Sequence, residues 1–150
     1  MRGGQWQALH LMRGLREQGV ETRLLAREGT MLLAEAALLG MEVSTFSRLR
    51  LRAWSRWASL VHVHDAKAHY EAALLSRVPI VVSRRVAFPI RRGLLSRWKY
   101  SRAALYLAVS RAVARELEAA GVPAAKIRVV YDAVPVPAEP GRRDGAVVAL

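Results

Sequence analysis

Short apolar runs alternate with longer helix-patterned segments along most of this chain. Runs of strand length lie at 21–26, 41–46, 60–63, 79–83, 105–109 and 127–131. Helix patterns run from a glycine pair to Gly19 and over 31–39, 48–58, 66–77, 94–103 and 110–120. Such alternation is typical of βαβ units, whose right-handed crossovers place helices on both faces of a parallel sheet. The sequence therefore predicts an α/β fold with a doubly wound, mostly parallel sheet.

Residues that start and stop helices support these boundaries. Thr30, Asp65 and Ser110 each precede a helical pattern and suit an N-cap, where a side-chain oxygen accepts free backbone N–H groups. Gly19 and Gly40 follow two of the patterns, as expected of residues that end helices.

Both ends of the sequence read as incomplete. A glycine pair that opens a helix normally follows a strand, but no strand precedes Gly3-Gly4. Residues 135–145 contain three prolines and two glycines, which indicates a linker. We therefore expect one domain at 1–134 that lacks its first strand, a linker at 135–145, and at 146–150 the beginning of a C-terminal domain that is missing.

A candidate site lies where the strand at 60–63 ends. On that strand His62 and His64 share one face, and Asp65 and Lys67 follow at its carboxyl end, where open α/β sheets bind ligands. The alternative is that Asp65 only caps the next helix and the histidines are satisfied by local hydrogen bonds.

Arg84 and Arg85 follow the next apolar strand, at 79–83. Arginines at a strand's carboxyl end can bind carboxylate or phosphate through two parallel hydrogen bonds. The alternative is a solvated basic loop.

The composition narrows the class of partner. Lys and Arg number 24 and Asp and Glu 12, giving a net charge of +12 that favours anionic partners. The chain has no cysteine, which excludes disulfides and thiolate metal sites. No apolar run has the roughly 18 residues that span a bilayer, and the first residues lack the apolar segment of a signal peptide. We therefore expect a cytoplasmic location.

Several catalytic signatures are absent from the sequence. It has no G-x-G-x-x-G dinucleotide motif, no G-x-x-x-x-G-K-[ST] phosphate loop and no G-x-S-x-G nucleophile elbow. His62 and His64 lie two positions apart on a strand without a clear third ligand, so we expect no metal.

Five short motifs, in order, resemble the N-terminal domain of retaining family-four glycosyltransferases of the GT-B fold. They cover nearly the whole chain, and they are Gly3-Gly4 with its helix, L-V-H-V-H-D at 60–65, P-I-V-V-S at 79–83, A-V-S at 108–110 and G-V-P-A-A-K-I-R-V-V at 121–130. Two positions depart from the family pattern. Val20 replaces a usual histidine, and Asp132-Ala133 stands where the family often has N-G-V.

The resemblance implies a Rossmann-like, acceptor-side domain of an enzyme that moves a sugar from a nucleotide-sugar donor to a carbohydrate or lipid-linked acceptor, without a cofactor. Gly3 and Gly4 would then face the donor diphosphate, and His64 would lie at the reaction centre. From their positions in the sequence, and not from the resemblance, we expect the acceptor side to be lined by Gln5, His62, Asp65, Lys67, Arg84 and Arg85. The donor-binding glutamates of the family belong to the second domain.

Two other classes remain open. A non-catalytic carbohydrate- or nucleotide-binding domain would share the fold, and the absence of a glutamate pair downstream would favour it. A nucleic-acid-binding module is supported by charge alone, because no recognition helix or aromatic platform is evident, and we expect no nucleic-acid partner.

The basic, tryptophan-bearing segment 48–58 carries Arg48, Arg52 and Arg56 on one helical stripe. Together with 91–102 it predicts peripheral association with an anionic membrane surface. The alternative is that the tryptophans pack on the sheet and the arginines are solvated.

Overall fold

A computed structural model of the protein describes residues 3–90 and 93–133. Its helices are α1 (Gly3–Glu17), α2 (Met31–Leu38), α3 (Arg48–Trp57), α4 (Ala66–Leu75), α5 (Leu94–Ser101) and α6 (Arg111–Ala119), with a 3₁₀ turn η1 (Ala124–Lys126). Its strands are β1 (Arg23–Ala26), β2 (Glu42–Thr45), β3 (Val61–Val63), β4 (Ile80–Arg84), β5 (Leu105–Ala108) and β6 (Ile127–Val129). Every element expected up to residue 131 is present, and the linker and strand expected at 135–150 lie outside the described residues.

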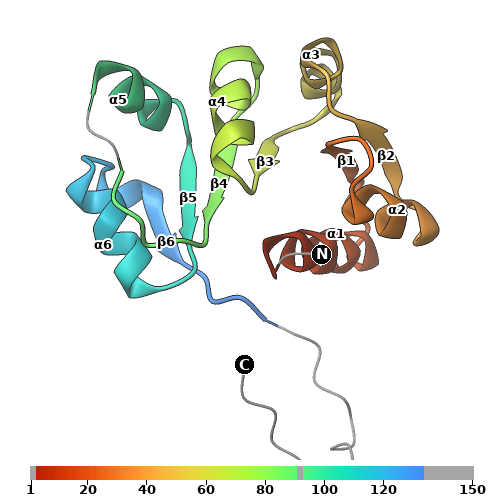
Figure 1. The fold of residues 1–150 in the computed structure, drawn as a ribbon, viewed down its shortest axis with the longest axis horizontal. Helices are drawn as coiled ribbons and strands as arrows, with labels where there is room; N and C mark the ends of the chain where they lie inside the picture. The colour runs from red at the N-terminus through yellow and green to blue at the C-terminus, as the bar shows by residue number, and fades with distance from the viewer. Residues whose placement is uncertain (1–2, 91–92, 134–150) are drawn as a thin grey trace, which may run out of the picture.

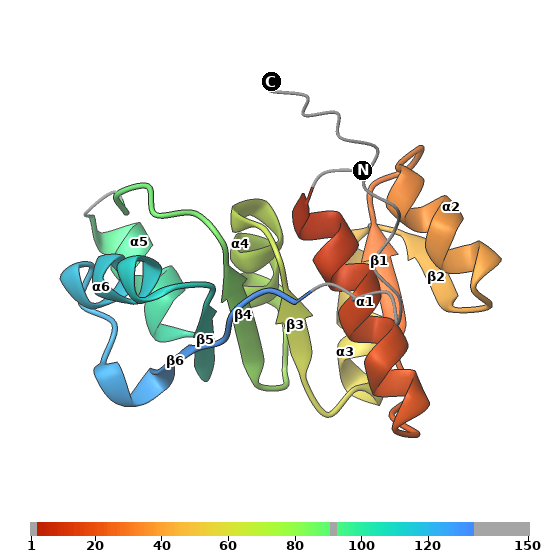
Figure 2. The same cartoon turned by 90° about the horizontal axis from the view of Figure 1, so that it is seen from below.

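All strand pairs are parallel, but they form two sheets (Figure 1). β1 pairs with β2, and the order of the larger sheet is β3-β4-β5-β6. No described strand joins β1 to β3, and both views show α1 beside this division (Figures 1 and 2).

Helices cover both faces of the strands, which confirms the doubly wound arrangement. On one side of β1 and β2, Leu9 of α1 and Leu32 of α2 pack with Leu24 and Val43. On the other side α3 lies over β1, where the ring of Trp57 stacks on the Arg23 guanidinium at 3.9 Å. Side chains alternate between the faces of a strand, so Leu24 and Arg23 point in opposite directions.

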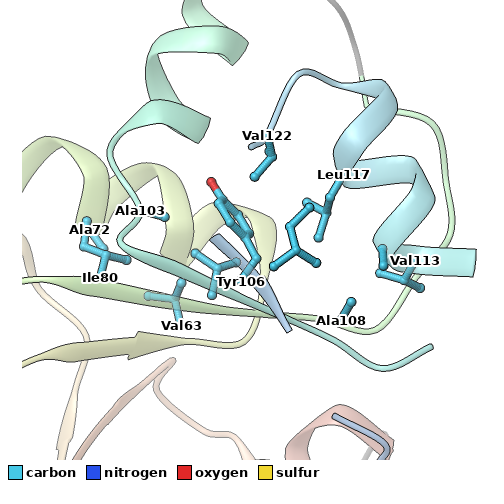
Figure 3. Close-up of a cluster of buried hydrophobic side chains, with 12 residues drawn as sticks. Val63, Ala72, Ile80, Ala103, Tyr106, Ala108, Val113, Leu117 and Val122 are labelled. Atoms are coloured by element: carbon cyan, nitrogen blue, oxygen red, sulfur yellow. The ribbon is translucent and has the colours of Figure 1, made fainter. Parts of the chain in front are cut away.

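The larger core lies between the four-stranded sheet and the helices α4, α5 and α6 (Figure 3). Tyr106, Ile80 and Leu117 are fully buried at its centre. The Tyr106 hydroxyl donates a hydrogen bond to the Tyr100 carbonyl oxygen at 2.7 Å, so this buried polar group is satisfied. Burial raises the pKa of Tyr106, which keeps the phenol neutral.

Polar side chains cap several of the helices as the sequence predicts. The Asp65 carboxylate accepts hydrogen bonds from the backbone N–H groups of Lys67 and Ala68, both at 2.8 Å. Ser110 accepts from Val113 N at 3.3 Å at the start of α6. Thr30 occupies the N-cap position of α2, but its cap was predicted wrongly. Its hydroxyl donates back to the Arg27 carbonyl, so it makes no side-chain cap bond.

Glycines end the first and last helices in the left-handed region. Gly19 has φ 77° after α1 and Gly121 has φ 87° after α6. A residue with a Cβ atom is strained in that conformation, which explains why these two positions stop their helices.

Replacing Asp65 by Ala is expected to lower the free energy of unfolding by about 1 kcal/mol, because two N–H groups of α4 lose their acceptor. Asp65→Ser, which can still accept from the backbone, is the matched control and is expected to retain most of the stability. Urea unfolding followed by circular dichroism measures both variants. Equal losses from the two substitutions would show that the cap is not what Asp65 contributes.

Candidate functional site

The candidate site lies at the carboxyl ends of β3 and β4, on the face opposite the larger core. Val61 and Val63 of β3 point toward the core, as Ile80 and Val82 of β4 do. Side chains alternate on a strand, so the residues between and after them project to the other face. His62 and Ser83 lie on this face within the strands, and Arg85 follows the end of β4.

The two histidines are held against each other and against β4. Their ring centroids lie 4.3 Å apart, and the planes are tilted by 32°. His62 Nε2 is hydrogen-bonded to the Ser83 hydroxyl at 2.9 Å. Burial lowers the pKa of His62 to about 4, with a further contribution from the Arg85 charge. Burial, His62 and Arg85 together lower the pKa of His64 to about 3, so both rings are neutral at pH 7.

Arg85 is the residue that joins the parts of the site. Its Nη1 group lies 3.0 Å from His64 Nδ1, and its Nε group is 3.0 Å from each carboxylate oxygen of Asp132. A Cβ atom on Gly4 would lie 3.8 Å from Arg85 Cδ, so the start of α1 also reaches this side chain. Three segments far apart in sequence therefore meet along the Arg85 side chain, two of them at its guanidinium and the start of α1 at its Cδ atom.

The neighbouring Arg84 belongs to a different environment. Its side chain projects toward α5, where Nη1 donates to the Tyr100 hydroxyl at 3.2 Å and Nη2 donates to the Phe88 carbonyl. The two arginines, which the sequence places side by side, are thus on opposite faces of β4. The structure brings Arg85 to the histidines and does not bring Arg84 there.

The glycine pair differs from the expected strand-to-helix loop. Gly3 and Gly4 already belong to the first turn of α1. The N-terminal end of α1, which carries the partial positive charge of the helix dipole, therefore lies on the side of the Arg85 side chain. Gln5 follows in the same turn and is half-buried.

The other two predicted residues behave as parts of α4. The Asp65 carboxylate caps α4, which agrees with the alternative that Asp65 only caps this helix. Lys67 is exposed in the first turn of the helix, and no described contact joins it to the histidines.

A groove of about 360 Å³ runs between α1 and the sheet face that carries His62 and Ser83. Residues 130–133 line part of it, and Gln7 of α1 donates a hydrogen bond to the Ala133 carbonyl at 2.9 Å. Arg85 and Asp132 also line it, beside apolar side chains such as Leu107. Within residues 3–90 and 93–133, no group of three or more His, Cys, Asp or Glu side chains could hold a metal ion.

The sequence motifs do not indicate that Asp132, Ser83 or Gln7 belong to the site. Asp132 had one usable signal, since it departs from the N-G-V pattern of the resembled family. The alternation along β4 could have placed Ser83 on the face of His62. Nothing in the local sequence indicates that Gln7 contacts Ala133, because the two are 126 positions apart.

Solved structures share this fold. HepE of Anabaena in complex with UDP matches with a TM-score of 0.76 at 14% identity, over 89% of this chain and 41% of that one. A second structure of the same protein, with UDP-glucose, gives a TM-score of 0.73. The apo form of WaaB, a lipopolysaccharide outer core galactosyltransferase, gives 0.65 at 18% identity, over 96% of this chain and 46% of that one. The chain thus spans less than half the length of these structures.

No curated protein matches the sequence. The family model described as Glycosyltransferase Family 4 matches residues 1–136, which include every residue that the structure describes. The expected Rossmann-like fold and the resemblance from short motifs are both confirmed. The chain belongs to glycosyltransferase family 4.

Proposed function

We propose that the chain is the acceptor-side part of an enzyme that transfers a sugar from a nucleotide-sugar donor to an acceptor. The observation that carries this proposal is the convergence of Gly4, Arg85 and His64 at the carboxyl edge of the sheet. Two of the similar structures are of a protein solved with UDP or UDP-glucose, which supports a nucleotide-sugar donor here. Because they span more than twice this chain, the donor-binding groups are expected in a second domain.

The chemistry of the site fits the departure of a nucleoside diphosphate. Negative charge develops on the leaving diphosphate, and donors fixed beside it lower the barrier. The Arg85 guanidinium is such a donor, and the partial positive charge at the N-terminus of α1 lies on the same side of the site. His64 lies against Arg85, where a neutral imidazole can contact the reacting sugar.

The acceptor is proposed to be a carbohydrate or a lipid-linked carbohydrate. The groove between α1 and the sheet offers both polar groups, such as His62 and Ser83, and apolar groups, such as Leu107. Sugar rings present hydroxyl groups and apolar faces together, so a mixed lining of this kind suits them.

The other classes are distinguished by simple measurements. A non-catalytic binding domain would bind a nucleotide-sugar or an oligosaccharide without turnover even when the donor domain is present. A nucleic-acid module would bind oligonucleotides with an affinity that falls steeply with salt. The decisive assay is release of UDP from UDP-sugars by the longest reading frame that contains this chain.

We expect the chain by itself to transfer no sugar, because the donor-binding glutamates of the family are not among its residues. The measurement is release of UDP from a panel of UDP-sugars with mixed oligosaccharide acceptors. Circular dichroism confirms that the chain is folded in the assay. Turnover above that of a heat-denatured control would contradict this expectation.

In the complete enzyme, His64→Ala is expected to lower turnover by about 10²–10³-fold, the typical cost of removing one positioned polar group. His62→Ala is expected to cost much less, because His62 is one pleat deeper and its Nε2 atom is engaged by Ser83. Steady-state kinetics with saturating donor compares the two variants. Equal, small losses of turnover in the two variants would show that the reaction takes place elsewhere.

A membrane surface is proposed as a second partner, contacted by the helices α3, α4 and α5, which lie side by side along one edge of the molecule (Figure 1). The side chains that support this proposal in the structure differ from those expected from the sequence. Arg48 is engaged by Glu71 at 2.8 Å, and Trp54 and Trp57 lie against Arg23 rather than facing outward alone. Arg52 and Arg56 remain exposed on α3.

Exposed apolar side chains before and at the start of α5 also favour membrane binding. Leu94 is 86% exposed, Leu95 64% and Phe88 73%, and the exposed Arg97 lies one turn beyond Leu94. Apolar groups beside arginine suit the boundary between lipid headgroups and acyl chains. Among the described helices, none is both long enough and apolar enough to cross a bilayer.

We expect the chain to co-sediment with anionic vesicles at low salt and to be released at high salt, because each basic residue contributes about 1 kcal/mol near such a surface. Replacing Arg52 and Arg56 by Glu is expected to abolish binding. The matched control replaces Arg111 and Arg115 by Glu, since these exposed arginines are also four positions apart on a helix but lie away from this edge. Equal binding by both double variants would contradict the proposed surface.

A further inference from the structure

Asp132, Arg85 and His64 form a continuous row of hydrogen bonds. Arg85 Nε donates to both oxygens of the Asp132 carboxylate at 3.0 Å, and Nη1 of the same guanidinium lies 3.0 Å from His64 Nδ1. The Arg85 side chain is only 18% exposed and that of Asp132 34%. This arrangement fixes the orientation of the guanidinium, because a planar donor group that is bonded at two edges cannot rotate freely.

The direction of the last hydrogen bond determines where His64 carries its proton. A guanidinium has five N–H donors and no acceptor, so the atom facing it must accept. Nδ1 therefore presents its lone pair to Arg85, and a neutral imidazole then has its proton on Nε2. The groups that face His64 are His62 and Arg85, with Asp132 behind Arg85.

We propose that Arg85, held by Asp132, is a positioning residue that keeps His64 in the neutral tautomer with its proton on Nε2. This deepens the proposed function and rests on it for its consequence. In this tautomer Nε2–H is a hydrogen-bond donor, and the ring has no free lone pair with which to abstract a proton. His64 then contributes by donating a hydrogen bond to an oxygen of the bound sugar or diphosphate, and not as a general base.

The location of Asp132 gives this row of bonds a second role. Residues 130–133 line the groove and are tied to α1 by the hydrogen bond from Gln7 to Ala133. The state of His64 is therefore coupled, through Arg85, to a segment that lines the groove. A substitution at Asp132, which touches neither histidine in the described contacts, is expected to change the histidine.

The test is ¹⁵N NMR of the chain with labelled histidine, recorded from pH 3 to pH 8, with His64→Gln used to assign the resonance. In the wild-type protein we expect His64 Nδ1 to have the shift of an unprotonated nitrogen and Nε2 that of a protonated one, down to the low pKa of this ring. In Arg85→Met we expect a mixture of both tautomers. The His64 pKa is expected to rise by about one pH unit or more, tenfold in the protonation equilibrium, because a nearby cation is lost.

Two further variants complete the design. Asp132→Asn keeps the shape of the side chain but removes its charge, so Arg85 is held less firmly and a smaller admixture of the second tautomer is expected. The His64 pKa is expected to fall in this variant, because a negative charge that compensates Arg85 is lost. Arg111→Met removes one positive charge from an exposed position of α6 and is expected to leave His64 unchanged. The amide spectrum of each variant reports whether it is folded. If Arg85→Met does not fold, the test of the proposal rests on Asp132→Asn.

Protonated Nδ1 in the folded wild-type protein would overturn the proposal. So would unchanged His64 shifts and pKa in a folded Arg85→Met or Asp132→Asn variant. These outcomes are independent of the proposed function, which fails separately if the complete enzyme releases no UDP from any UDP-sugar while the tautomer is as expected.

Discussion

The ion pair between Arg85 and Asp132 is the contact on which the arrangement of the site depends. It joins the end of β4 to a segment that follows β6, and these segments are 47 positions apart in the sequence. Without it, Arg85 would be a largely buried cation beside two neutral imidazoles, and the uncompensated charge would cost several kcal/mol. With it, the guanidinium is held against His64, and the segment that lines the groove after β6 is held to the end of β4.

Much of the fold could be predicted from local pattern. Apolar runs such as 79–83 and caps such as Asp65 depend only on neighbouring residues, because burial on a strand and capping of a helix are local requirements. The side-chain cap expected at Thr30 does not form, because the Thr30 hydroxyl donates to the Arg27 carbonyl instead. The local sequence pattern does not reveal this competing acceptor. The pairing of β3 through β6 follows from the order of the strands once right-handed crossovers are assumed.

The site was predicted in part. Strand alternation places His62 and His64 on one face, and the structure brings Arg85 to them at the carboxyl end of the strand, as the order of the segments suggests. Alternation also places Arg84 and Arg85 on opposite faces of the strand, although the two were predicted to act together. The contact with Asp132 could not be predicted, because it depends on how a segment after the last strand crosses the sheet. Contacts of this kind are set by tertiary packing and leave no periodic trace in the sequence.

The division of the strands into two sheets has a consequence for how the molecule opens. Within the described residues, twelve buried side chains form the larger core and five the smaller one, and the two cores share no residue. Units with separate cores unfold with separate free energies. Amide protons of β1 and β2 should therefore exchange with deuterium through a lower-energy opening than those of β4 and β5. The helix α1 belongs to the smaller core, and its Gly4 lies beside the Arg85 side chain. The site therefore lies between a slowly exchanging half of the molecule and a rapidly exchanging one.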